Sequence, residues 1–351
     1  MLLFFSCLWA CGKVYVFYHL KAREPLTAVE TYYSSDGSAK LVAFSPPKNP
    51  ENRIPLVMAG GMGGNFRSWH EWLKRLNRDE KENYVLYDFG YDSSKFPIRE
   101  NGAKLDECLK KAGIKNPLYM AHSSGGHIIR SCQIEQRKNS DFRAMIAIAV
   151  PWHGVPTLIK DWAVEGVKTV FPFMWKLIVG NVYNVSQPGL EDLRWDNYDY
   201  GIPKGCSDYL NEQTNKCLFE LNQKDTNWEK YYAIAGNRSL ENIESTFPKY
   251  MLLAYATLWK MLFIEDIFVH NELTYGALLM ASIPNKKGDI YESDGVVPVG
   301  SALGAELPIM RDKEVFEGYD HEDLMTMSRD PEDKLYKYVK AILDYEAKKR
   351  N

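Results

Sequence analysis

Short runs of apolar residues recur along the first half of the chain and alternate with longer stretches of helical periodicity. The runs predict strands at residues 29–33, 40–44, 55–59, 84–87, 118–122 and 145–149. Between them, apolar side chains at helical spacing predict helices over residues 68–77, 100–112 and 124–135. Continuous apolar strands separated by helices are typical of a mostly parallel sheet that helices cover on both faces. We therefore expect an α/β fold.

The regular alternation ends after Pro151. Two long apolar and aromatic sections follow, at about residues 155–227 and 237–289, while strand candidates resume at 230–235 and 314–317 and a charged helix is expected from 331 to about 350. The two sections are predicted to be insertions that form a helical cap on the sheet. The alternative is a mobile lid whose apolar underside lines an acyl pocket or touches lipid. Charged residues interrupt the second section, which argues against a bilayer-spanning helix there.

The first 23 residues differ from the rest of the chain. They begin with MLLFFSCLWA, and a second apolar run covers residues 14–20 after Lys13. Such a segment favours export or anchoring, so we expect the protein to be exported or membrane-associated, with an ordinary packing segment as the alternative. The residues Leu8-Trp9-Ala10-Cys11 loosely resemble a bacterial lipoprotein signal. The folded domain is then expected over residues 24–351.

Composition narrows the range of functions. With 351 residues, 45% hydrophobic and 25% charged, the chain is typical of a globular protein. A formal net charge of −3 argues against a nucleic-acid partner. The six cysteines show no metal-binding spacing, although Cys206 and Cys217 flank a polar loop and could close a short disulfide if the chain is exported.

The sequence LYMAHSSGGH at residues 118–127 predicts a strand that enters a helix through a tight turn. Ser123 has Ala121 two positions before it and Gly125 two positions after it. A nucleophile on such a strained turn needs small residues at both positions, because the chain reverses sharply there. Ser124 fits less well, since His122 would then take the crowded position. Ser123 is therefore the predicted nucleophile.

A glycine-rich loop, Gly60-Gly61-Met62-Gly63-Gly64, follows the strand predicted at residues 55–59. Acyl transfer needs N–H donors for the oxyanion, and glycines let the backbone approach a substrate closely. By position, the backbone N–H groups of Met62 and Ser124 are the predicted donors. The glycines match neither GxxxxGK nor GxGxxG, so no nucleotide partner is expected.

Asp294, in SDGVVP, lies in a turn before the last strand, and His321, in GYDHED, lies in a loop before the last helix. The order Ser123, Asp294, His321 is that of serine hydrolases of the α/β-hydrolase type. His321 is predicted to take the Ser123 proton, while Asp294 orients the imidazole. His122 and His127 are expected to be packed and hydrogen-bonded. His153 is expected to fix a loop beside the site, with a secondary base role left open.

On these motifs the sequence resembles the α/β-hydrolase superfamily and, within it, bacterial triacylglycerol lipases and esterases. The segments that carry the resemblance are PLVMAGGMGG, AHSSG, AVPWHG, QPGLEDLR, YYAIAGN, SDGVVP and YDHED. The chain departs from the family at Gly60, where His is usual, and at Ala121, where Gly is usual. The resemblance implies an α/β-hydrolase fold, with Ser123, Asp294 and His321 as the triad and Met62 and Ser124 as the oxyanion donors.

The sequence thus predicts a serine ester hydrolase of the lipase or esterase type that forms an acyl-enzyme on Ser123. The apolar insertions favour acyl-chain lipid esters as substrates and contact with a membrane surface. An acyltransferase or lipid-remodelling deacylase on the same triad is one alternative, and a catalytically silent binding protein is another. No cofactor or metal is expected, because Asp323, which matches a calcium-binding position in some lipases of this group, is a single carboxylate.

Overall fold

The computed structural model describes residues 28–44, 53–61, 69–80, 83–93, 95–138, 142–155, 188–193, 215–237, 294, 296–305, 307–327 and 331–349. The predicted leader at residues 1–23 lies outside these ranges, as do most of the two predicted insertions. The anchor and the cap or lid therefore stay predictions. Within the described ranges, no helix is both long and apolar enough to cross a lipid bilayer.

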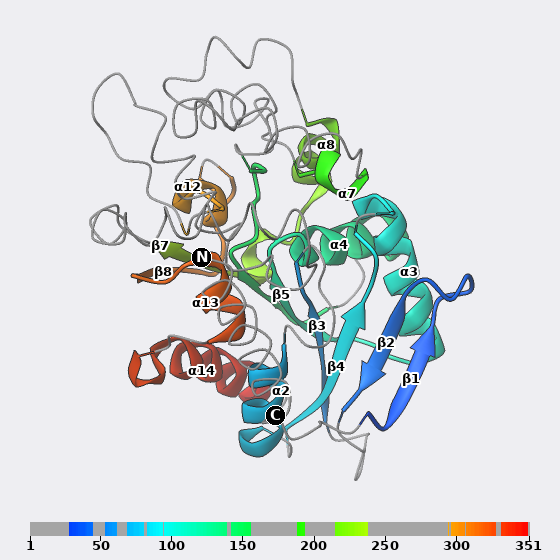
Figure 1. Ribbon diagram of the computed structural model, residues 1–351, viewed down its shortest axis with the longest axis horizontal. Coiled ribbons are helices and arrows are strands. Elements are labelled where there is room, and N and C mark those ends of the chain that lie inside the picture. The colour runs from blue at the N-terminus through cyan, green and yellow to red at the C-terminus, as the bar shows by residue number, and fades with distance from the viewer. Residues whose placement is uncertain are drawn as a thin grey trace, which may run out of the picture.

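The centre of the molecule is a mixed sheet of eight strands (Figure 1). The strands are β1 (Glu30–Tyr33), β2 (Lys40–Ala43), β3 (Ile54–Ala59), β4 (Tyr84–Gly90), β5 (Leu118–His122), β6 (Met145–Ile148), β7 (Tyr231–Asn237) and β8 (Asp312–Glu317). Their order in the sheet is β1-β2-β4-β3-β5-β6-β7-β8. The pairs β1–β2 and β2–β4 are antiparallel, and the other five pairs are parallel. All eight predicted strands are present, with ends shifted by a few residues.

Helices pack on both faces of the sheet, as the apolar strands require (Figure 1). The first face carries α2 (His70–Asp79), α13 (His321–Thr326) and α14 (Lys334–Lys348). The second face carries α3 (Ile98–Lys111), α4 (Gly125–Ser131) and α8 (Lys216–Lys224). Successive side chains of a strand point to opposite faces of the sheet. Met58 of β3 therefore packs in the core under the first face, and Val57 packs in the core under the second. The predicted α/β fold is confirmed.

Shorter helices complete the described part of the chain. They are α7 (Pro188–Glu191), α12 (Val299–Ala302) and 3₁₀ turns at Trp228–Lys230 and Pro331–Asp333. A π-helix at Cys132–Gln136 continues α4, and the Arg137 N–H donates to the Cys132 carbonyl at 3.0 Å. Residues 124–135, which the sequence predicts as one regular helix, therefore change their hydrogen-bonding pattern after Ser131.

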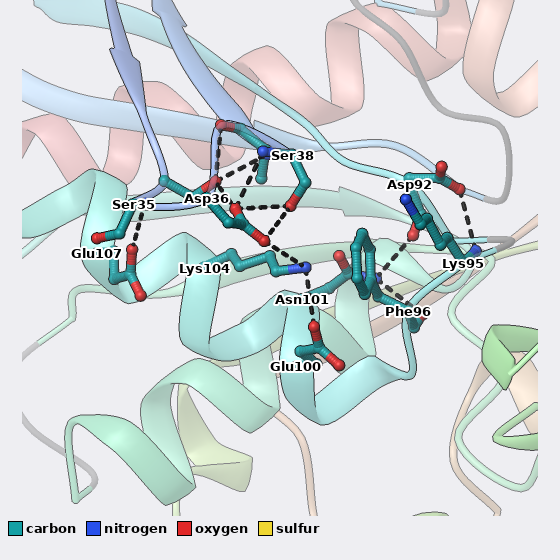
Figure 2. Close-up of polar contacts among 12 residues, drawn as sticks. Ser35, Asp36, Ser38, Asp92, Lys95, Phe96, Glu100, Asn101, Lys104 and Glu107 are labelled. Carbon is teal, nitrogen blue, oxygen red and sulfur yellow. Dashed lines mark hydrogen bonds and ion pairs between the residues drawn. The ribbon is translucent and has the colours of Figure 1, made fainter.

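Hydrogen bonds and ion pairs connect the antiparallel hairpin of β1 and β2 to α3 (Figure 2). Asp36, in the turn between β1 and β2, accepts hydrogen bonds from the Ser34 hydroxyl at 2.7 Å and the Ser38 N–H at 3.0 Å. The buried Lys104 ammonium of α3 lies 3.3 Å from Asp36 and 3.0 Å from Glu100. The hydrogen bonds from Ser34 and Ser38 lower the pKa of Asp36, so this carboxylate keeps its charge at a more acidic pH than an ordinary aspartate.

The carboxyl ends of the parallel strands meet at one edge of the sheet, where ligands bind in open α/β folds. The glycine loop follows β3 there, Tyr91 follows β4, and Ser123 follows β5. The chain around His321 follows β8 at the same edge. The topology thus gathers residues that are far apart in the sequence.

Candidate active site

Ser123 occupies the turn between β5 and α4 in a backbone conformation that a serine rarely adopts. Its φ is +54°, in the left-handed region that costs a non-glycine residue about 1–3 kcal/mol when it is strained. Two backbone hydrogen bonds hold it there: the Ser123 N–H donates to Ile148 O at 3.0 Å, and the Gly126 N–H donates to Ser123 O at 3.1 Å. The strained turn predicted from the small residues around Ser123 is therefore present.

Gly125 and Gly126 lie too close to neighbouring segments to carry a side chain. A Cβ atom on Gly125 would lie 2.2 Å from the Ala59 carbonyl oxygen, and one on Gly126 would lie 2.4 Å from the Val150 side chain. The start of α4 therefore rests directly on the backbone that leaves β3 and on the segment that follows β6. Neither contact leaves room for a side chain.

Asp294 and His321 are in direct contact. The His321 Nδ1 lies 2.7 Å from Asp294 Oδ2, and the His321 N–H donates to the Asp294 carbonyl at 3.0 Å. The other carboxylate oxygen, Oδ1, accepts hydrogen bonds from the N–H groups of Val296 at 2.9 Å and Val297 at 2.7 Å. With both oxygens engaged, the carboxylate fixes Nδ1 as a donor and leaves His321 Nε2 as the nitrogen that can accept a proton.

His122 joins this pair to the serine turn. Its Nε2–H donates to the His321 carbonyl at 3.0 Å, and the two imidazole rings lie 4.4 Å apart between centroids. Burial, and then the neighbouring His321, lower the pKa of His122 well below its ordinary value, so the ring is neutral. The structure thus brings Asp294 and His321 together and places His321 against the residue next to Ser123. The expectation that His122 is packed and hydrogen-bonded is confirmed.

Of the two predicted oxyanion donors, Met62 lies outside the described residues. Its neighbour Gly61 is described, and a Cβ atom there would lie 2.9 Å from Ser123 Cβ and 3.3 Å from Ser123 Oγ. The loop that leads into Met62 therefore runs against the serine. Ser124 stands at the start of α4, and in the described part of the chain no carbonyl accepts a hydrogen bond from its N–H.

Tyr91 is a buried residue of this region that the sequence did not single out. Its hydroxyl lies 2.7 Å from Gly60 O, 3.2 Å from Gly61 O and 3.2 Å from Ser124 Oγ. The only sequence signal for Tyr91 is its position directly after β4, because its partners come from two other loops at the same sheet edge.

A buried ion pair joins α4, the helix that follows Ser123, to the end of α8. Arg130 of α4 donates to Asp225 at 2.9 Å and to Asn222 of α8 at 2.8 Å, and Asp225 also accepts the Tyr231 hydroxyl at 2.8 Å. His127, which accepts from Arg130 at 3.2 Å, donates to Pro151 O at 2.8 Å. The network ties α4 and α8 to the segment after β6, and it was not predicted from the sequence.

His153 lies in the loop after β6, as expected. His153 donates through Nε2 to Ala305 O at 2.7 Å, and burial lowers its pKa to about 4, so a neutral ring fixes this loop.

Cys217 is a free thiol on α8, and Cys206, its suggested partner, lies outside the described residues. Asp323 accepts from the Asp320 N–H at 3.3 Å, and its own N–H donates to Asp320 at 2.8 Å. Among the residues described, no cluster of three metal-ligating side chains occurs.

Comparison with known proteins rests on three-dimensional structure, since no family model and no curated protein matches the chain. The mature form of the lipase BlEst2 from Bacillus licheniformis is similar over 83% of this chain and 95% of that chain, with 17% identity and a TM-score of 0.50. The chain has the α/β-hydrolase fold. Two Bacillus subtilis enzymes are also similar: naproxen esterase (12% identity, 93% and 95% coverage, TM-score 0.45) and carboxylesterase CesB (10% identity, 90% and 91% coverage, TM-score 0.45).

The α/β-hydrolase fold accounts for the placement of the predicted residues. In this fold the nucleophile turn follows a central strand, and the acid and then the histidine follow later strands. Ser123 follows β5, Asp294 lies between β7 and β8, and His321 follows β8. The resemblance inferred from the sequence motifs is confirmed at the level of the fold.

Proposed function

We propose that the protein is a serine ester hydrolase with Ser123, Asp294 and His321 as its catalytic triad. The observation that carries the proposal is the 2.7 Å hydrogen bond between His321 and Asp294 next to the strained Ser123 turn. The left-handed φ of +54° places Ser123 on a sharp turn between a strand and a helix, which is the backbone geometry that a serine nucleophile of this type requires. The shared fold with the lipase BlEst2 supports an ester substrate.

The proposed reaction runs through an acyl-enzyme. Ser123 Oγ attacks the ester carbonyl carbon while His321 Nε2 takes the hydroxyl proton, and the tetrahedral oxyanion accepts hydrogen bonds from the N–H groups of Ser124 and Met62. The carbon–oxygen bond to the alcohol then breaks, and His321 returns the proton to the leaving alcohol. Water attacks the acyl-serine, His321 takes its proton and passes it to Ser123, and the carboxylic acid leaves. Asp294 holds the tautomer of His321 throughout.

The proposed substrate class is lipid esters with an acyl chain. The support is the apolar character of residues 155–227 and 237–289, which interrupt the sheet in the sequence on either side of β7. Export or membrane association through residues 1–23 is part of the same proposal. Activity should therefore rise with acyl length across a series of p-nitrophenyl esters and extend to triacylglycerol or phospholipid. Hydrolysis of the short esters alone would contradict the lipid part.

The triad is tested by covalent labelling with a fluorophosphonate probe, which forms a bond to an activated serine. We expect labelling of the unchanged protein and none of Ser123→Ala, whose ester hydrolysis should fall by about 10³-fold or more. Ser131→Ala removes a serine from the far end of α4, whose hydroxyl donates to Glu135 at 2.9 Å, and should label normally. Absence of labelling in the unchanged protein would favour a binding protein. Transfer of the acyl group to an added alcohol in place of water would favour an acyltransferase.

A further inference from the structure

One buried hydroxyl contacts the backbone of the glycine loop and the side chain of Ser124, the two segments that would carry the oxyanion donors. The Tyr91 Oη lies 2.7 Å from the carbonyl oxygen of Gly60, in the loop after β3, and 3.2 Å from the Ser124 hydroxyl, at the start of α4. Met62, one proposed donor, follows this loop, and Ser124 carries the other proposed donor. The tyrosine therefore joins the backbone at Gly60 to the Ser124 side chain.

The direction of each hydrogen bond follows from the groups involved. A phenol carries one proton, and a carbonyl oxygen can only accept, so the Tyr91 O–H donates to Gly60, with Gly61 O at 3.2 Å as a second acceptor. The Ser124 hydroxyl then donates to Tyr91 Oη. Burial raises the pKa of Tyr91, so the phenol keeps its proton across the working pH range. The result is a continuous chain from Ser124 through Tyr91 to Gly60.

The serine turn also packs closely against the glycine loop. A Cβ on Gly125 would lie 2.5 Å from the Gly60 carbonyl oxygen, and one on Gly61 would lie 2.9 Å from Ser123 Cβ. The backbone at Gly60 and Gly61 is thus in contact with both the Tyr91 hydroxyl and the turn that carries Ser123. Loss of the hydroxyl would remove the hydrogen bonds that fix the Gly60 carbonyl beside the start of α4.

Tyr91 itself has a rigid support that does not depend on the serine turn. Its ring stacks on Phe89 of β4, with centroids 5.6 Å apart. The segment that follows Tyr91 is tied to α3, because the Asn101 side-chain amide donates to Phe96 O at 3.0 Å and to Asp92 O at 3.3 Å (Figure 2). The hydroxyl is therefore a fixed point against which the loop is positioned.

We propose that Tyr91 is a positioning residue that holds the backbone at Gly60 and Gly61 in place relative to Ser124 and so supports the proposed oxyanion hole, an inference that rests on the proposed ester hydrolysis. Oxyanion donors act only when they lie within hydrogen-bond distance of the oxygen in the tetrahedral intermediate, so a shift of the loop weakens binding of that intermediate more than binding of the ground-state ester. Tyr91 touches neither substrate nor Ser123 in this scheme. It acts through Gly60 and Ser124.

The test compares Tyr91→Phe with Tyr84→Phe. Tyr84 is a matched control, since its buried hydroxyl also donates to a backbone carbonyl, Leu343 O at 2.6 Å, but in the core next to α14. For Tyr91→Phe we expect kcat on a p-nitrophenyl ester to fall roughly 10- to 100-fold with KM unchanged, because only the tetrahedral state loses stabilisation. Affinity for an alkyl trifluoromethyl ketone, which forms a tetrahedral adduct with an active serine, should fall by the same factor. Tyr84→Phe should keep both values while losing comparable thermal stability.

Three results would overturn the inference. They are an unchanged kcat in Tyr91→Phe, an equal loss of kcat in Tyr84→Phe, and a rise in KM that accounts for the whole loss. Ser124→Ala keeps the backbone donor but removes the hydrogen bond to Tyr91. It should lower kcat less than Tyr91→Phe does. The double variant Tyr91→Phe with Ser124→Ala should have the same kcat as Tyr91→Phe alone. If Tyr91→Phe does not fold, an unchanged kcat in Ser124→Ala overturns the inference. An unchanged protein that neither hydrolyses esters nor labels with a fluorophosphonate would instead contradict the proposed function.

Discussion

The imidazole of His122 donates a hydrogen bond to the carbonyl of His321 at 3.0 Å, and the two rings lie 4.4 Å apart between centroids. This contact joins the turn that carries Ser123 to the loop that carries His321. The proposed reaction needs a neutral His122, because a second positive charge would oppose the protonation of His321. Burial of His122 supplies that neutrality by lowering its pKa well below the ordinary value.

Replacing His122 by Phe keeps a ring of similar shape but removes the donor to His321. We expect kcat to fall roughly 10- to 100-fold, because the imidazole proposed as the base loses the hydrogen bond that holds its backbone in place. His122→Gln can donate from a similar position and should restore most of the activity. The pH–rate profile should keep its shape in the Gln variant, since burial lowers the pKa of His122 well below its ordinary value and the ring is already neutral. Loss of an ionisation from that profile would contradict this role.

Asp294→Asn tests the orientation of His321. The amide oxygen can still accept from Val296 and Val297, but the amide nitrogen then donates to His321 Nδ1 and imposes the wrong tautomer. We expect kcat to fall by about 10³- to 10⁴-fold in a folded protein, as for the equivalent change in other serine triads. Asp312→Asn, an exposed change on β8, is the control and should keep kcat. Near-normal activity of Asp294→Asn in steady-state assays would rule out this carboxylate as the third triad member.

Asp88 of β4 should make the stability of the fold depend on pH. It is buried, its Oδ2 has no hydrogen-bond partner, and burial raises its pKa to about 7. A carboxyl group with a raised folded-state pKa favours folding below the unfolded-state pKa of about 4, and this contribution is lost as pH rises through about 7. The loss amounts to at most roughly 4 kcal/mol, from a difference of about three pKa units.

Asp88→Asn should remove this dependence. We expect its free energy of unfolding in urea to vary less between pH 4 and pH 8 and to exceed that of the unchanged protein at pH 8. Asp344→Asn, which alters a partly exposed carboxylate on α14 that pairs with Lys340, is the control and should show the same pH dependence as the unchanged protein. An Asp88→Asn variant that loses stability at pH 8 would show that the ionised carboxylate is stabilised in the fold.

Gly125→Ala should disrupt the site through the backbone. The added methyl group would meet the carbonyl oxygens of Ala59 and Gly60, which cannot move aside as a flexible side chain can. We expect a loss of about 3 kcal/mol or more in unfolding free energy, at the upper end of overpacking costs. Gly113→Ala has free space and only a positive φ of +66°, so it should cost about 1 kcal/mol. Equal losses of unfolding free energy in the two variants would show that the backbone after β3 can move to accommodate the methyl group.

The strands and the turn at Ser123 could be predicted because both depend on local patterns. Short apolar runs predicted the strands of the described sheet, including β8, whose run is only Val315 and Phe316, and the small residues around Ser123 predicted its strained turn. The end of β4 was placed too early, because Asp88 interrupts the apolar run although it is buried within the strand. Tyr91 and the ion pair of Arg130 with Asp225 were missed. Their partners lie up to 95 positions away in the chain, and only the packed fold brings them together.

The contact between His122 and His321 joins residues 199 positions apart. Under the proposed mechanism, the nucleophile turn is synthesised long before the base that activates it. A nascent chain that has not yet extended beyond β8 carries the serine without its proton acceptor. Catalytic competence therefore arises only once β8 has joined the sheet edge and the turn after it has closed on His122. Enzymatic turnover, measured during refolding, would report the docking of this last strand and not the formation of the central sheet.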